Sequence, residues 1–137
     1  MLVEWEYVRE FHIKFGHPIS DVPIMLKQDR IDKRYKWMMD ELNEFTKAED
    51  VVEQADAMID LMYFALGVLV EMGVKPDEIF KIVHEANMNK LWDDGKPHYD
   101  SAGKTVKPQD WESPYKKMKE VIESMRCKIY DKKNFES

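Results

Sequence analysis

The sequence EQADAMIDLMYFALGVLVEMG, residues 53–73, places the strongest constraint on the fold. It is long enough for about six helical turns, contains no proline and ends at a glycine, as helices commonly do. After Gln54 nearly every residue is apolar, so we expect a helix that is buried on most of its surface. Asp56 and Asp60 nevertheless lie within it. Because an unpaired buried carboxylate is costly, the fold must bring a compensating group to these side chains.

Apolar residues at helical spacing predict two helices before this one. Residues 3–15 form the first, which Gly16 ends, and residues 28–47 form the second, after a connector that contains two prolines. The faces expected to be buried are Val3, Tyr7, Val8, Phe11 and Phe15 in the first helix and Ile31, Tyr35, Met38, Leu42 and Phe45 in the second. Asp50 is the predicted N-cap of the third helix, with Glu53 as its capping-box partner.

Two more helices are predicted after the apolar one. The first begins with Pro76 at its first position and runs to about Leu91. Residues 92–113 are rich in turn formers and predict an ordered tail or a short hairpin, and residues 114–129 predict a last amphipathic helix. No segments alternate as strands do. We therefore expect an all-α fold, most simply a four-helix bundle with a C-terminal tail and an extra helix.

Composition narrows the classes of partner. The 137 residues suit one domain with a core of moderate size, and the formal net charge of −6 disfavours nucleic acid and anionic membranes. Cys127 is the only cysteine, so no intrachain disulfide is expected. The N-terminus shows no leader-like apolar stretch, and the acids in the apolar helix argue against a membrane span. We expect a cytoplasmic protein.

Acidic residues recur at helical spacing on two consecutive helices. Glu53, Asp56 and Asp60 share one stripe of the third helix, and Glu41 and Glu44 lie one turn apart on the second, with Asp40 beside them. The connection between the two helices is short, so the helices should be antiparallel neighbours. That arrangement can bring the two acidic stripes face to face.

Converging carboxylates repel each other unless cations lie between them, and oxygen ligands without thiols select Mg²⁺ or Mn²⁺. Taken alone, Glu41 and Glu44 fit a solvated helix face, and Glu53 fits a capping residue. Asp56 and Asp60 favour a functional role, because their helix has almost no polar face. A di-iron carboxylate site is excluded, since none of the four histidines has a glutamate three positions earlier.

Three segments carry a resemblance to a known family: DELNEF, ADAMIDLMYFALGVLVEMGV and HEANMNKLWDDGKPHYDSAGKTVKP. They resemble the all-α nucleoside triphosphate pyrophosphohydrolases, a superfamily that includes MazG proteins, dimeric dUTPases and phosphoribosyl-ATP pyrophosphohydrolases. The phosphoribosyl-ATP-pyrophosphohydrolase-like branch is the most similar. The resemblance covers roughly residues 1–111, which we predict to form the MazG-like domain, with residues 112–137 as a C-terminal helix and tail.

The resemblance implies a Mg²⁺ site built from an EExxE motif on one helix and an ExxD motif on the next. Asp40, Glu41 and Glu44 match the first motif, with aspartate in the leading position. The second is ambiguous: residues 53–56 read ExxD literally, whereas the register counted from Gly73 points to Asp60. The AD-x-x-x-D pattern of the similar branch matches residues 55–60. The implied metal ligands are Glu41, Glu44, Asp56 and Asp60, and the implied catalytic residues are Glu41, Glu44 and Asp60.

The NMNK sequence at residues 87–90 matches the family's habit of ending the fourth helix with Asn and Lys facing phosphates. The resemblance thus implies substrate binding by Asn87 and Lys90, although such residues also suit an ordinary helix C-terminus. The implied reaction is Mg²⁺-dependent cleavage between the α- and β-phosphates of a nucleoside triphosphate, giving a monophosphate and pyrophosphate. A homodimer or homotetramer is expected. The alternatives are a non-catalytic helical interaction or regulatory protein, a phosphoribosyl-ATP-type pyrophosphohydrolase, and an enzyme acting on another phosphate ester.

Overall fold

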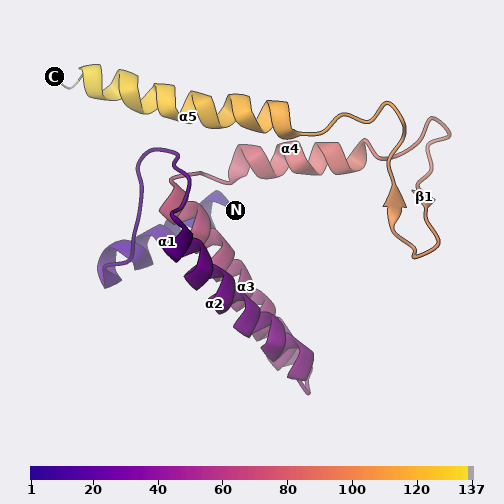
Figure 1. Ribbon diagram of the computed structural model, residues 1–137, viewed down its shortest axis with the longest axis horizontal. Helices are drawn as coiled ribbons and strands as arrows, with labels where there is room; N and C mark the ends of the chain where they lie inside the picture. Colours follow the sequence, from indigo (N-terminus) through magenta and orange to yellow (C-terminus); the bar gives the residue numbers. More distant parts are fainter. Residues whose placement is uncertain (136–137) are drawn as a thin grey trace. The chain divides into compact units, whose positions relative to one another are not determined.

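The structure, a computed structural model, describes residues 1–135, with side chains described to Lys128 (Figure 1). The elements are α1 (Leu2–Phe15), α2 (Gln28–Lys47), α3 (Val51–Met72), α4 (Asp77–Met88), β1 (His98–Tyr99), β2 (Thr105–Val106) and α5 (Tyr115–Phe135). The prediction of an all-α fold is confirmed. The chain forms two compact units, one of residues 1–76 with the chain from residue 125, the other of residues 77–124.

Helices α2 and α3 form an antiparallel hairpin in the first unit, as predicted (Figure 1). Only residues 48–50 join them. The side chain of Asp50 accepts a hydrogen bond from the backbone N–H of Glu53 at 2.8 Å, which confirms the predicted N-cap. At the other end, Gly73 has a φ of 70°, the left-handed conformation in which glycine ends helices. Both ends of the helix that carries Asp56 and Asp60 are therefore fixed by local sequence.

The core of the first unit lies where α1 crosses α3. It consists of Trp5 and Val8 from α1 and Leu66 and Val70 from α3. The predicted buried face of α1 is wrong in part: Val3, Tyr7 and Phe15 are exposed, whereas Val8 is buried as predicted and the helix also buries Trp5 and His12. Trp5, Val8 and His12 have helical spacing too. His12 was missed because its burial depends on polar partners that the sequence of α1 does not show.

The buried face of α2 also differs from the prediction. Tyr35 is 64% exposed and Leu42 and Phe45 are about 40% exposed, whereas Arg34 is only 5% exposed. Arg34 is held by Glu71 of α3, an ion pair that joins the first part of α2 to the end of α3. An ion pair between distant residues thus decides which side of α2 faces α3.

The second unit contains α4 and a short hairpin. β1 and β2 pair antiparallel, with His98 opposite Val106 and Tyr99 opposite Thr105, so the predicted hairpin is present. Helix α4 ends at Met88 rather than near Leu91, and the last helix extends further than residue 129. Within the described residues, no single helix is both long and apolar enough to cross a membrane; α3 and α4 meet such a criterion only when taken together as a bent pair.

Candidate active site

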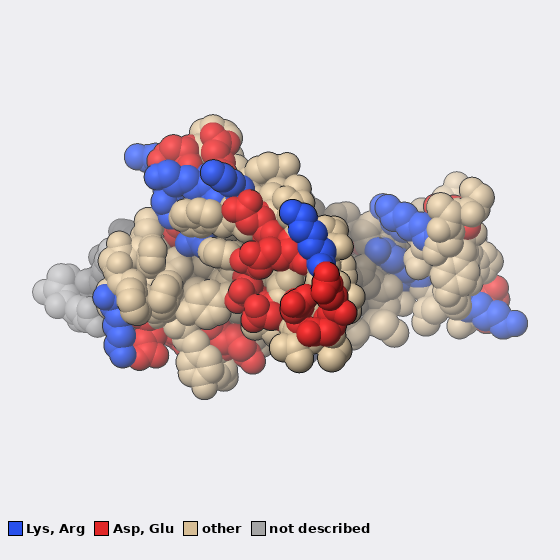
Figure 2. All heavy atoms as spheres, turned by 90° about the horizontal axis from the view of Figure 1, so that it is seen from below, with Lys and Arg blue, Asp and Glu red and all other residues tan. Residues whose placement is uncertain are grey.

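Acidic side chains gather around the hairpin of α2 and α3, and Figure 2 shows an acidic patch on the face it presents. Glu41, near the end of α2, and Asp60, in α3, are half-buried, whereas Glu44 and Asp56 are exposed. The Oε2 atom of Glu41 is buried and has no hydrogen-bond partner within residues 1–135. A buried carboxylate oxygen without a partner is costly and is therefore unusual in a structural role.

The four carboxylates interact across the two helices. Burial, a side-chain interaction with Glu44 and the negative charges of Glu44, Asp60 and Asp56 raise the pKa of Glu41 to about 7. Burial, Asp56 and Glu44 likewise raise the pKa of Asp60. The two acidic stripes thus lie close enough to repel each other, as their spacing predicts. No basic side chain is among the causes of either pKa shift, so the negative charge of this cluster is not offset.

The chemistry of these carboxylates suits a hard divalent cation. Their donors are all oxygens, the preferred ligands of Mg²⁺ and Mn²⁺, and both the partnerless Oε2 of Glu41 and the raised pKa values favour an added positive charge. Their side chains do not form a finished coordination group: in the part of the chain that is described, no three His, Cys, Asp or Glu residues are placed to hold one ion. The assignment of Glu41, Glu44, Asp56 and Asp60 as metal ligands therefore stays a prediction.

The other acids at this end of the hairpin have separate positions. A carboxylate oxygen of Glu53 accepts a hydrogen bond from the backbone N–H of Glu49 at 2.7 Å, and its own N–H is bound by Asp50. Glu53 therefore caps α3, as one of the two readings of the sequence expected. Asp40, the aspartate in the leading position of the first motif, is exposed.

Asn87 and Lys90 lie together in the second unit. The Nζ of Lys90 donates a hydrogen bond to Oδ1 of Asn87 at 2.8 Å and lies 5.6 Å from the ring centre of Trp111. The Nζ of Lys107 lies 4.6 Å from the same ring. Two lysines, an amide and an indole thus form one polar cluster, and its role in binding phosphate stays a prediction.

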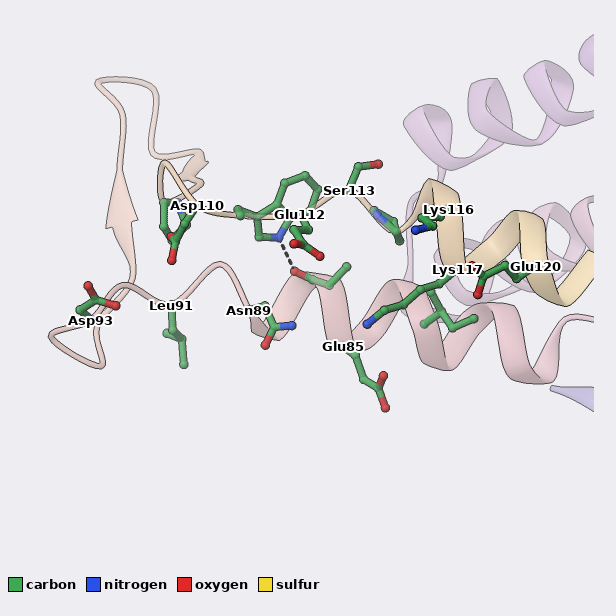
Figure 3. Close-up of a pocket in the computed structure, with 15 residues that line it drawn as sticks. Glu85, Asn89, Leu91, Asp93, Asp110, Glu112, Ser113, Lys116, Lys117 and Glu120 are labelled. Atoms are coloured by element: carbon green, nitrogen blue, oxygen red, sulfur yellow. Dashed lines mark hydrogen bonds between the residues drawn. The ribbon is translucent and has the colours of Figure 1, made fainter.

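The second unit also contains a cavity of about 550 Å³, shown in Figure 3. The indole N–H of Trp111 donates to the carbonyl oxygen of Ala86 at 2.7 Å and closes one wall. Glu85, Asp93, Asp110, Glu112 and Glu120 line it together with Lys116 and Lys117. Because acids outnumber bases around it, this cavity is poorly suited to a polyphosphate.

A smaller cavity of about 250 Å³ lies within the first unit, and none of its lining residues was predicted as a site residue. Its lining residues are Phe11, His12, His17, Arg34, Trp37, Tyr63 and Phe64. Trp37 precedes Glu41 by four residues, and Phe64 follows Asp60 by four. Each pair is thus one helical turn apart, so the cavity adjoins the acidic turns of both helices. That spacing was the available signal, but the aromatic residues read equally well as core.

Charged and polar groups hold Arg34 in the wall of this cavity. Glu71 accepts hydrogen bonds from Nε of Arg30, at 2.7 Å, and from Nε of Arg34. Burial alone would raise the pKa of Glu71, but these two bonds outweigh it and the pKa lies below its ordinary value. The Nη2 of Arg34 lies 3.4 Å from Nε2 of His12. This cluster is compensated, unlike the acids at the other end of the hairpin.

The model of the phosphoribosyl-ATP pyrophosphohydrolase family matches residues 8–87, more than half of the chain. The chain belongs to the phosphoribosyl-ATP pyrophosphohydrolase family. The matched range spans both acidic turns and the small cavity between α1, α2 and α3. Membership of the phosphoribosyl-ATP pyrophosphohydrolase family makes the chain a pyrophosphohydrolase, a hydrolase that acts on phosphoanhydride bonds.

Among solved structures, the chain is similar to the crystal structure of a proposed NTP pyrophosphohydrolase from Exiguobacterium sp. 255-15. The two are 27% identical, with 95% of this chain and 97% of the other covered and a TM-score of 0.48. No curated protein matches this member of the phosphoribosyl-ATP pyrophosphohydrolase family.

Proposed function

We propose that the chain is a Mg²⁺-dependent nucleoside triphosphate pyrophosphohydrolase that cleaves between the α- and β-phosphates and releases a monophosphate and pyrophosphate. The observation that carries this proposal is the group of four mutually repelling carboxylates on α2 and α3, which includes the partnerless buried oxygen of Glu41. A pyrophosphohydrolase needs positive charge beside its substrate's phosphates, and this cluster is built to attract it.

Glu41, Glu44, Asp56 and Asp60 would hold the divalent ions, which neutralise the phosphates and acidify a bound water. One of these carboxylates would also accept a proton from the attacking water. Asn87 and Lys90 would bind phosphate oxygens, Lys90 as a mobile positive charge.

The test is a screen of nucleoside triphosphates with Mg²⁺ or Mn²⁺ and identification of the products. We expect monophosphate and pyrophosphate from the wild type, and a loss of at least about a thousandfold in turnover for Glu44→Ala and Asp60→Ala with the fold retained. Glu49→Ala is the matched control, since it removes an exposed acid at the same end of the hairpin. Full turnover in both cluster variants would exclude the assigned site. Release of orthophosphate alone would exclude the assigned bond.

A second candidate substrate is phosphoribosyl-ATP, which the family match favours. Its turnover is measured in the same screen, beside the ordinary triphosphates. A preference of more than about a hundredfold in kcat/KM for phosphoribosyl-ATP would select this alternative. A complete lack of turnover, together with no stabilisation by Mg²⁺, would instead select a non-catalytic interaction protein.

We also propose a homodimer or homotetramer. Several large apolar side chains of α3 lie at the surface: Val51 and Val52 are more than 70% exposed, and Ile59 is 59% exposed. A second copy that covered them would remove this apolar surface from water. Light scattering coupled to size-exclusion chromatography tests the assembly, and a monomer at micromolar concentration would contradict it.

A further inference from the structure

The small cavity of the first unit has aromatic walls. The rings of Trp37 and Phe64 are 6.0 Å apart between centroids and inclined by 30°. The ring of Phe11 stacks with that of His17 at 5.4 Å and meets the edge of Tyr63 at 5.7 Å. Ligand pockets of whole drug-sized molecules usually measure about 300–1,000 Å³. A cavity of about 250 Å³ is therefore matched to one flat ring system rather than to a whole nucleotide.

Arg34 is the charged group in this wall, and three contacts fix its position. Its Nε donates to Glu71, and its Nη2 lies 3.4 Å from Nε2 of His12. Among the side chains described, to Lys128, no hydrogen bond of Arg34 uses Nη1, so this nitrogen still has hydrogens to donate. A Cβ atom placed on Gly67 would lie 2.6 Å from Nη1, so the glycine makes room for this nitrogen.

His12 contributes to this arrangement as a neutral acceptor. Its Nδ1 lies 2.8 Å from the carbonyl oxygen of Pro18, which can only accept, so Nδ1 carries the proton and Nε2 presents a lone pair to Arg34. Burial lowers the pKa of His12, and the positive charge of Arg34 adds to this. The cluster of Arg30, Arg34 and Glu71 then has two positive charges and one negative charge. This buried excess of positive charge favours an acceptor from a ligand.

We propose that this cavity binds the nucleobase of the substrate and that Arg34 selects bases carrying a carbonyl oxygen. The inference rests on the proposed function, because it places the base one helical turn from the carboxylates that would act on the phosphates. The aromatic walls hold any flat base by stacking. The guanidinium adds selectivity, since arginine pairs well with a carbonyl oxygen and an adjacent ring nitrogen, as with O6 and N7 of guanine.

The experiment titrates nucleosides, which lack phosphate, into the full chain without divalent metal, with calorimetry as the readout. Inosine and purine riboside are the matched ligands, because they differ only in the 6-carbonyl group and its ring proton. We expect inosine to bind at least about tenfold more tightly, as a hydrogen bond to a charged donor predicts. Equal affinities for the two nucleosides would overturn the role of Arg34.

Three variants separate stacking from selection. Phe64→Leu removes an aromatic wall and should weaken both nucleosides by about tenfold. Tyr35→Leu, which also replaces an aromatic ring by leucine but at an exposed position of α2, should alter neither. Gly67→Ala should remove most of the preference for inosine, because its methyl carbon would lie 2.6 Å from Nη1 and the guanidinium of Arg34 would have to move. Unchanged affinities in Phe64→Leu would overturn the cavity as the binding site.

The same titration distinguishes failure of this inference from failure of the proposed function. Asp60→Ala should bind inosine as the wild type does, because the nucleoside has no phosphates to bring to the carboxylates. Carbonyl-selective binding without turnover of any triphosphate would overturn the proposed reaction and leave the base site supported. Turnover whose KM is unchanged in Phe64→Leu and Gly67→Ala would support the reaction and overturn the base site.

Discussion

Helices α2 and α3 carry two clusters of charged side chains, and only one of them has its charges compensated. Toward the start of α2 and the end of α3, the buried carboxylate of Glu71 bonds to Arg30 and Arg34, and its pKa is lowered despite burial. Toward the hairpin connection, burial and the negative charges of other acids raise the pKa values of Glu41 and Asp60. No basic side chain contributes to either shift. One cluster is compensated within the chain and the other is not.

The difference separates a structural from a functional use of charge. A buried carboxylate with two arginines is satisfied by the fold itself and joins α3 to α2. A group of mutually repelling carboxylates is unfavourable in the folded chain and becomes favourable only with a bound cation. Four carboxylates kept together at a cost in stability therefore indicate a site.

The largest expected effect on stability is at Glu71. Glu71→Ala leaves Arg30 and Arg34 with unpaired charge in the interior, so we expect a loss of about 3–5 kcal/mol in the free energy of unfolding. Urea denaturation followed by circular dichroism measures this loss. Asp60→Ala provides the comparison: it removes an acid from the uncompensated cluster and should change stability by less than about 1 kcal/mol. Equal losses in the two variants would contradict the distinction between the clusters.

Glu41→Gln should have a smaller effect of opposite sign. The amide keeps the size of the side chain and removes a charge that its neighbours repel. We expect the variant to be more stable than the wild type by about 1 kcal/mol at pH 8 without divalent metal, a modest figure because solvent screens part of the repulsion. Added Mg²⁺ should stabilise the wild type more than the variant, since only the wild type regains a compensated cluster. Thermal unfolding with and without Mg²⁺ tests both statements.

The two clusters should also give opposite dependences of stability on pH. The folded pKa of Glu41 lies above its ordinary value, so the folded chain binds more protons, and stability should fall as pH rises from 4.5 to about 7. The folded pKa of Glu71 lies below its ordinary value, so its contribution is present above the unfolded pKa and is lost as pH falls through the folded one. Metal-free unfolding curves across this range should decline toward neutral pH in the wild type and decline less in Glu41→Gln. A rise in wild-type stability from pH 5 to 7 would contradict the raised pKa.

Local features of the fold and of the acidic cluster could be predicted from the sequence. The helices and the hairpin follow from residues close together in sequence, such as the Asp50 cap and Gly73, and these predictions are confirmed. The acidic stripes follow from spacing within single helices and a short connection. Local patterns of this kind are complete within a few turns of chain, so a sequence contains all the information they need.

The misassigned faces depend on pairs far apart in sequence. Arg34 is buried because of Glu71, 37 residues later, and His12 because of Arg34 and the carbonyl of Pro18. A charged residue at such a position reads as exposed until its partner is known, so the apolar stripe with Tyr35 was chosen instead. For the same reason the aromatic cavity was not predicted, because Arg34 forms its polar wall.

The smallest expected effects concern the acids that cap α3, beside the uncompensated cluster. Asp50 accepts the N–H of Glu53, and Glu53 accepts the N–H of Glu49, so each satisfies a backbone donor. Asp50→Ala should therefore cost about 1 kcal/mol in the free energy of unfolding, and Glu53→Ala about half of that, both without Mg²⁺. Because these losses come from helix capping, pyrophosphate release with Mg²⁺ should stay within about twofold of the wild type. A large loss of turnover in Glu53→Ala with its stability unchanged would move Glu53 from the capping group into the catalytic cluster.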